Sequence, residues 1–353
     1  MEEKTSPKKP VLLEFLSFVV RPAKTISEFP EKKSPKKLKK KGSTVIWEKI
    51  KSFLSHFFDV IRLWSLQYVL AISAGILSLI LTNKLQVDTG EHAVNTLLTE
   101  ASALFILFFS VIYAPITEEL SFRGVLRPNL GIIGFSLPFT ILVALQFIIN
   151  FFPTLEGVIP SFLYNPFIWQ GALFYLAFII IATTTGVLLD RKLMLGKKIS
   201  AFYIKNIWWM YYLSAVIFGV LHITNFIAYK EILFFMPLLI APQLIVGFFL
   251  GFIRIRYNLN WSILAHMLHN LISVAPILLL ISFVDGYATL MQNPELNPSE
   301  IMSFKDMAIV LFVFAIAIIV FLFLLILIAQ MIAEVVIYLV KVNSLKVNER
   351  GKS

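Results

Sequence analysis

Repeated apolar stretches constrain this chain more than any other feature. A helix needs about 20 consecutive apolar residues to cross the hydrocarbon core of a bilayer, and several stretches reach that length. The composition agrees, because 58% of the 353 residues are hydrophobic and only 15% are charged, whereas a soluble domain is typically about 45–50% apolar. The sequence therefore predicts an all-α fold, a polytopic membrane helix bundle.

The apolar stretches divide into about eight predicted transmembrane helices. These are 60–82, 93–115, 132–152, 167–189, 207–227, 232–253, 261–283 and 307–340. Pro153 ends the third helix. Pro237 and Pro242 predict kinks in the sixth, which neighbouring membrane helices can tolerate.

Three regions follow from this layout. Residues 1–55 are predicted to be a basic cytoplasmic tail without ordered structure, apart from a candidate interfacial segment at 11–20. Residues 56–345 form the transmembrane domain, with a motif-bearing core at 97–282, and 346–353 form a second tail. The lysine-rich run within the first tail is either a topology anchor or a site for anionic lipid headgroups, which attract each basic residue by about 1 kcal/mol.

Basic residues give the predicted orientation. With the N-terminus in the cytoplasm, 28 of the 31 Lys and Arg residues fall on the cytoplasmic side and three outside, as the positive-inside rule requires. Both termini are therefore predicted to be cytoplasmic, and the loop at 278–306 faces out. The richness in Lys, Ile and Phe hints at an AT-rich gene and a prokaryotic cell membrane.

The charge and the missing cysteines exclude some functions. The net charge of +10 lies in a tail and in alternate loops, so membrane lipids are expected partners and nucleic acid is not. The absence of cysteine excludes disulfides, thiol nucleophiles and Cys-ligated zinc.

The segment ITEELSFRGVLR at 116–127 places two carboxylates at the end of the second apolar stretch. A charge at the bilayer centre costs about 2.5–3.5 kcal/mol, so these groups need partners. Glu119 and Arg123 are spaced i,i+4 and can form an ion pair on one helix face. Glu118 then faces the bundle interior, where a carboxylate suits general acid–base chemistry. The alternative is a Glu–Arg pair that merely ends the helix.

Two later stretches carry histidines. His222 lies one turn after Phe218, and a lone histidine of this kind is more often a hydrogen-bonded core residue than a catalyst. His266 and Asn270 share a helix face, with His269 offset, and could stabilise a developing oxyanion or merely join helices at about 0.6 kcal/mol per hydrogen bond. His266 lies roughly 8 Å into its helix and His222 roughly 23 Å into its own. If the two histidines meet, the fifth helix is predicted to begin later, near Met210, or to be tilted or kinked.

Three motifs occur in order along these stretches. EExxxR runs from Glu118 to Arg123, FxxxH from Phe218 to His222 and HxxxN from His266 to Asn270. With them the chain resembles the CPBP family of intramembrane proteases, which includes the type II CAAX prenyl endopeptidases and their bacterial bacteriocin-processing and immunity relatives. The resemblance covers about 97–282.

The resemblance implies an eight-helix bundle whose active-site cavity opens to the cytoplasmic side. Glu118 and His222 would activate a water that attacks a peptide carbonyl, and His266 and Asn270 would form the oxyanion hole. Glu119, Arg123 and His269 would support them. This chemistry needs no cofactor. In an alternative reading, Glu118, His222 and His266 are ligands of a catalytic zinc.

The expected function is therefore an intramembrane endopeptidase that hydrolyses a membrane-associated protein or peptide. A non-enzymatic immunity or scaffold protein is one alternative. A transporter that relays protons through Glu118 and the histidines is another, although no inverted repeat supports it. The substrate stays open between a prenylated CAAX tail, a leader peptide and a membrane-anchored peptide.

Overall fold

The computed structural model describes residues 7–28, 42–87, 101–127, 129–192, 195–226, 232–293 and 295–350. Within these ranges the chain forms helices and no β-strand. Seven of the described helices are long and apolar enough to cross a membrane, or eight if the bent pair of α10 and α11 counts as one span. The predicted all-α polytopic bundle is confirmed, and the chain is an integral multi-pass membrane protein.

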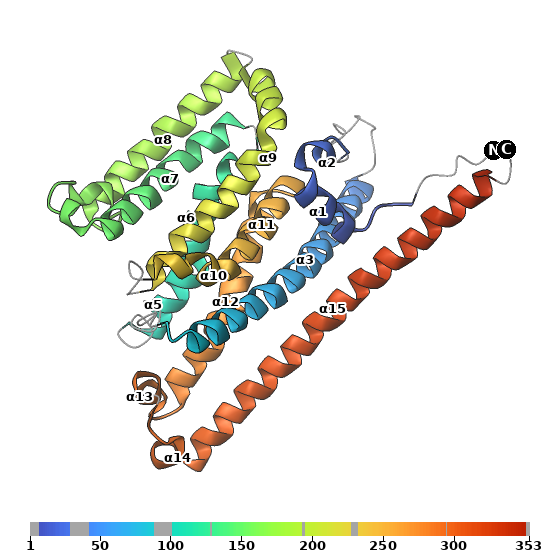
Figure 1. Cartoon of the computed structure of the whole chain (residues 1–353). Helices are drawn as coiled ribbons and strands as arrows, with labels where there is room; N and C mark the ends of the chain where they lie inside the picture. The colour runs from blue at the N-terminus through green and yellow to red at the C-terminus, as the bar shows by residue number, and fades with distance from the viewer. Residues whose placement is uncertain are drawn as a thin grey trace.

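The long helices run obliquely from upper right to lower left in Figure 1. They are α3 (Gly42–Lys84), α5 (Ala103–Leu107) with α6 (Ala114–Arg123), α7 (Leu130–Phe151), α8 (Trp169–Lys192), α9 (Leu195–Leu221), α10 (Met236–Leu239) with α11 (Ala241–Arg256), α12 (Leu259–Phe283) and α15 (Phe304–Arg350). Short helices are α1 (Val11–Val20), α2 (Pro22–Glu28), α13 (Tyr287–Gln292) and α14 (Pro298–Ile301). The described start of the chain and the end of α15 both lie toward the upper right.

Several predicted boundaries were wrong. The first and last membrane helices are longer than predicted, because α3 begins at Gly42 and α15 continues to Arg350. In the second span, a π-helical turn at Phe108–Tyr113 joins α5 to α6, and a 3₁₀ turn continues it to Leu126. The two glutamates therefore lie inside this span, not at its end. Residues 88–100, which include the predicted start of this span, lie outside the described residues.

The start of the chain is more structured than predicted. Helix α1 packs its aromatic face on α11, where the rings of Phe15 and Phe249 stack with centroids 4.1 Å apart. Glu14 forms an ion pair of 2.7 Å with Arg256. This helix is therefore part of the bundle packing, and α2 continues it. The lysine-rich run falls mostly at 29–41, which lies outside the described residues.

One bend is present in the predicted sixth span. Helices α10 and α11 meet at an angle of 50°. Pro237 and Pro242 each lie in the first turn of one of these helices, where the missing N–H of proline breaks no helical hydrogen bond. The break shortens α11 to 16 residues.

Helix α9 begins earlier than the depth of His222 suggested. Helix α9 has 27 residues and α11 has 16, which correspond to about 40 Å and 24 Å. Gly219 near the end of α9 packs against Leu244 near the start of α11, so these two ends lie level. The start of α9 therefore extends about 16 Å beyond the α11–α12 turn, which lies beside α1 in Figure 1. The expectation of a later start for this helix was wrong, because α9 begins at Leu195.

Helices α7 and α8 form a closely packed hairpin at the left of Figure 1. A Cβ atom on Gly134 would lie 2.2 Å from the carbonyl oxygen of Ala182, and one on Gly186 would lie 2.2 Å from that of Leu130. Glycine at these two positions therefore allows the backbones to approach, as small residues do between membrane helices.

Candidate active site

Three helices bring the predicted catalytic side chains together. Glu118 comes from α6, His222 from the 3₁₀ turn that ends α9, and His266 from α12. Oε2 of Glu118 lies 4.0 Å from Nε2 of His222 and 3.7 Å from Nε2 of His266. Both histidines therefore converge on a carboxylate that lies more than a hundred residues earlier in the sequence.

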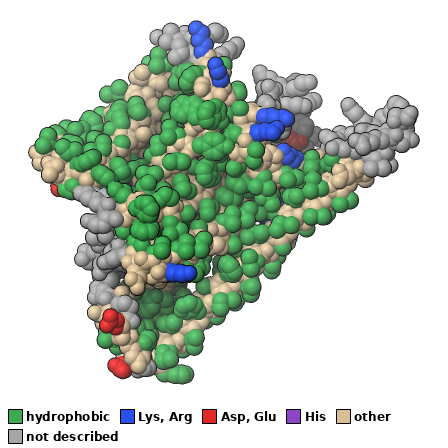
Figure 2. All heavy atoms as spheres, viewed as in Figure 1, with side chains coloured by type: hydrophobic (Ala, Val, Ile, Leu, Met, Phe, Trp, Pro, Cys, Tyr) green, Lys and Arg blue, Asp and Glu red, His purple; other side chains and the backbone are tan. Residues whose placement is uncertain are grey.

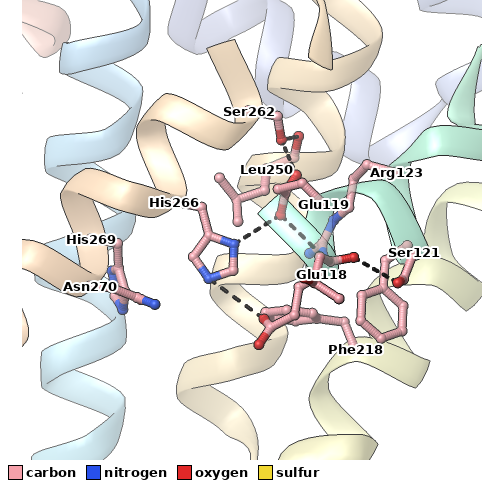
Figure 3. A network of polar contacts seen from close by, with 12 residues as sticks. Glu118, Glu119, Ser121, Arg123, Phe218, Leu250, Ser262, His266, His269 and Asn270 are labelled. Carbon is pink, nitrogen blue, oxygen red and sulfur yellow. Dashed lines mark hydrogen bonds and ion pairs between the residues drawn. The ribbon is translucent and has the colours of Figure 1, made fainter. Parts of the chain in front are cut away.

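The second glutamate is held rigidly beside the first. Glu119 is fully buried and forms the predicted i,i+4 ion pair with Arg123 at 3.3 Å. Nδ1 of His266 donates to the Glu119 carboxylate at 3.1 Å, and the hydroxyl of Ser262 donates to its other oxygen. Figure 3 shows His266 between the two glutamates. Glu119 is therefore saturated with partners, whereas Oε2 of Glu118 has no hydrogen-bond partner among the described residues.

Arg123 is the buried cation that offsets this carboxylate. Its guanidinium carbon lies 4.1 Å from the ring centroid of Phe218, close enough for a cation–π contact. The backbone at the end of α6 is fixed as well, because Arg254 donates to the carbonyl oxygens of Arg123 and Gly124 at 2.9 and 3.2 Å. Buried charges are thus paired with each other and with polar backbone groups.

Hydrogen bonds set the tautomers of the two histidines. Nδ1 of His222 donates to the carbonyl oxygen of Phe218 at 2.7 Å, so a neutral ring presents the Nε2 lone pair to Glu118. Nδ1 of His266 donates to Glu119. Its Nε2 can donate only when the ring is a doubly protonated imidazolium.

A cavity of about 450 Å³ contains these groups. His269 and Asn270 line it too, on the part of α12 beyond His266 (Figure 3). The amide of Asn270 donates to the carbonyl oxygen of Ser110 at 2.7 Å. Ser110 belongs to the π-helical turn, a rare distortion that is frequent at functional sites. One N–H of the Asn270 amide remains for a ligand.

Sequence reasoning missed some supporting residues. Nε2 of Gln67 on α3 donates to Nδ1 of His269 at 2.9 Å, so the first membrane helix contributes to the site. Ser262 could have been found, because it lies four residues before His266 on the same helix face. Gln67 was harder to predict, because its only indication in the sequence is that a polar residue interrupts an apolar stretch.

The zinc alternative requires at least three donor side chains arranged around one metal ion. Among the residues with described side chains, no group of three or more His, Asp or Glu is arranged to hold a metal ion. Glu118, His222 and His266 point at one another without forming such a group. We therefore assign no step to a metal ion.

One known protein family matches part of this chain. The family described as type II CAAX prenyl endopeptidase Rce1-like matches residues 169–272, less than a third of the chain. This region contains His222, His266 and Asn270, while Glu118 precedes it. No curated protein and no solved structure gives a significant match.

Fold and family agree on the class of protein. The chain is a polytopic membrane helix bundle, and one region of it matches the model of a protease family. The resemblance to the CPBP family of intramembrane proteases is confirmed at this level.

Proposed function

We propose that the chain is an intramembrane endopeptidase in which Glu118 and His222 activate a water molecule. The observation that carries this proposal is the position of Glu118. Its Oε2 is buried without a hydrogen-bond partner in the structure and faces two imidazole nitrogens at 3.7 and 4.0 Å. A buried carboxylate oxygen without a hydrogen-bond partner is costly, and a catalytic role is one of the explanations for such a group.

A water molecule between Glu118 and His222 would be a nucleophile. Both groups present lone pairs, so the water donates one hydrogen to each and directs its own lone pairs elsewhere. Attack on a peptide carbonyl carbon forms the C–O bond and transfers one water proton to Glu118 or His222. The same group then protonates the departing nitrogen as the C–N bond breaks, which yields a carboxylic acid and an amine.

We propose that His266 and Asn270 stabilise the oxyanion of this tetrahedral intermediate. The free N–H of the Asn270 amide is one donor. His266 supplies a second from Nε2 as an imidazolium, since its Nδ1 already donates to Glu119. Donors fixed before the reaction are worth more than mobile ones, and the bonds to Ser110 and Glu119 fix both side chains.

Glu119, Arg123 and His269 have supporting roles in this proposal. The first two hold the α6 backbone and the His266 ring, and His269 lines the cavity. No cofactor takes part. The substrate is a membrane-associated peptide or protein segment, because the cavity lies between membrane-spanning helices.

The proposal is tested with detergent-purified protein and a library of fluorogenic membrane peptides, with and without a strong zinc chelator. Cleavage that survives the chelator supports the water activated by Glu118. Cleavage that the chelator abolishes, and that added zinc restores, refutes the metal-free mechanism in favour of the zinc enzyme. Folded protein that cleaves no peptide favours the non-enzymatic immunity or scaffold protein.

A further inference from the structure

The cavity extends from Glu118 in one direction along the bundle. Its walls are the first part of the second span, the end of α9, the start of α11 and the part of α12 beyond His266, represented by Phe109, Asn225, Pro242 and Ile277. These four helix segments all lie toward the lower left in Figure 1. Helix direction therefore places the whole cavity on one side of the reacting carboxylate.

A second branch leads toward the same end. A cavity of about 200 Å³ shares Glu118, His222 and Asn225 with the first. It shares Gln146 and Asn150 in turn with a third cavity of about 640 Å³. The third cavity includes the exposed Glu156 in the α7–α8 connection. Polar side chains therefore mark a route from the site to the surface.

Both branches have mixed walls. The branch that passes α7 has Gln146 and Asn150 among apolar side chains such as Phe147. The branch along α5 and α12 has apolar Ile277 beside polar Ser273. Both can therefore admit water, and the larger branch along α5 and α12 also suits the apolar side chains of a membrane peptide.

The opposite end of the site is closed by packed side chains. Beyond Glu119, the side chains of Leu126, Tyr211, Phe252 and Arg254 are almost completely buried. Helix α1 covers this end, with Phe18 in contact with Tyr211 at a ring separation of 4.8 Å. The cavity beside α1, of about 500 Å³, shares no lining residue with the cavity at Glu118.

The distribution of Lys and Arg residues identifies the closed end of the site as the cytoplasmic end. Arg127, Arg191 and Arg256 lie at helix ends or turns, and Lys341 lies in the last part of α15. All four belong to segments toward the top or upper right of Figure 1. Figure 2 shows Lys and Arg side chains mostly toward the upper right of this face and acidic ones toward the lower left. Since basic residues accumulate on the cytoplasmic side, the open end of the cavity faces away from the cytoplasm.

We propose that the site receives its substrate from the extracytoplasmic side of the membrane. The scissile bond then belongs to an exported peptide or to the outer juxtamembrane segment of a membrane protein. A tail anchored in the cytoplasmic leaflet meets the closed end. This inference rests on the proposed peptidase function for its substrate, while the direction of the cavity stands on geometry and charge. It replaces the cytoplasmic opening expected from the family resemblance.

Cysteine labelling tests the direction of the cavity without any need for catalysis. The chain contains no cysteine, so single substitutions report one position each. Glu156→Cys reports the mouth, Asn225→Cys the junction of the two branches, and Arg191→Cys is the control at the closed end. In intact cells, a membrane-impermeant maleimide should label the first two variants and should label Arg191→Cys only after permeabilisation. Labelling of Arg191→Cys alone in intact cells would overturn the proposal.

The sidedness of cleavage tests the substrate. A fluorogenic peptide selected from the library is added outside right-side-out vesicles and, separately, outside inverted vesicles. Cleavage should be at least tenfold faster in right-side-out vesicles, and the reverse preference would refute the substrate assignment. Failure of the peptidase function itself would look different, because neither preparation would cleave while the labelling pattern stayed the same.

Discussion

Replacing Arg123 with methionine should destabilise the bundle strongly. Arg123 and Glu119 are both fully buried and lie 3.3 Å apart, so the substitution leaves a buried carboxylate without its main counter-charge. Removing one partner of a buried pair costs about 3–5 kcal/mol. The free energy of unfolding can be followed by tryptophan fluorescence in an SDS titration, since the chain has six tryptophans.

The double variant Arg123→Met/Glu119→Gln is the matched control. It removes both charges at once, so at least about 1 kcal/mol of the loss should be recovered, within the range of coupling energies for contacting residues. Glu118→Gln should change the unfolding free energy by less than about 1 kcal/mol, because its Oε2 has no hydrogen-bond partner to lose. An Arg123→Met variant as stable as the wild type would refute the account of the buried pair.

Three further substitutions test separate parts of the structure. Asn270→Ala should lower kcat by about 10²–10³-fold in the peptidase assay, whereas proton transport through the histidines would survive it. Gln67→Leu leaves Nδ1 of His269 without its donor and should lower the unfolding free energy by about 1–3 kcal/mol in the SDS titration; unchanged stability would contradict the contact. Gly186→Ala places a methyl group against the carbonyl oxygen of Leu130 and should cost about 1–3 kcal/mol in the same titration; a stabilised variant would contradict the close packing.

The sequence was sufficient to predict those polar groups of the site that are costly to bury in a membrane. Glu118, His222 and His266 stand out because each interrupts an apolar stretch, and a bundle has to bring such groups together. The ion pair of Glu119 and Arg123 followed from helix periodicity alone. Their catalytic roles remain proposals.

The features of the site that could not be predicted depend on the hydrogen-bond register within helices and on where helices end. In the π-helical turn the partner of the Ser110 carbonyl oxygen would be residue 115, and Pro115 has no N–H, so this oxygen accepts from Asn270 instead. The proline is visible in the sequence, but the shift of the hydrogen bonds by one residue is not. The direction of the cavity depends on where α9 and α11 end, and predicted helix boundaries are uncertain by several residues. Gln67 lies in a helix without any motif, so only tertiary packing shows that it reaches His269.

The central claim is that Glu118 activates the attacking water, and the most direct test is the kinetics of Glu118→Gln. The control is Glu295→Gln, at an exposed glutamate in the connection after α13. General acid–base catalysis contributes about 10²–10⁴-fold, so kcat of Glu118→Gln should fall by that factor while KM changes little and the control keeps wild-type rates. A folded Glu118→Gln variant that retains more than a tenth of the wild-type kcat would contradict the account.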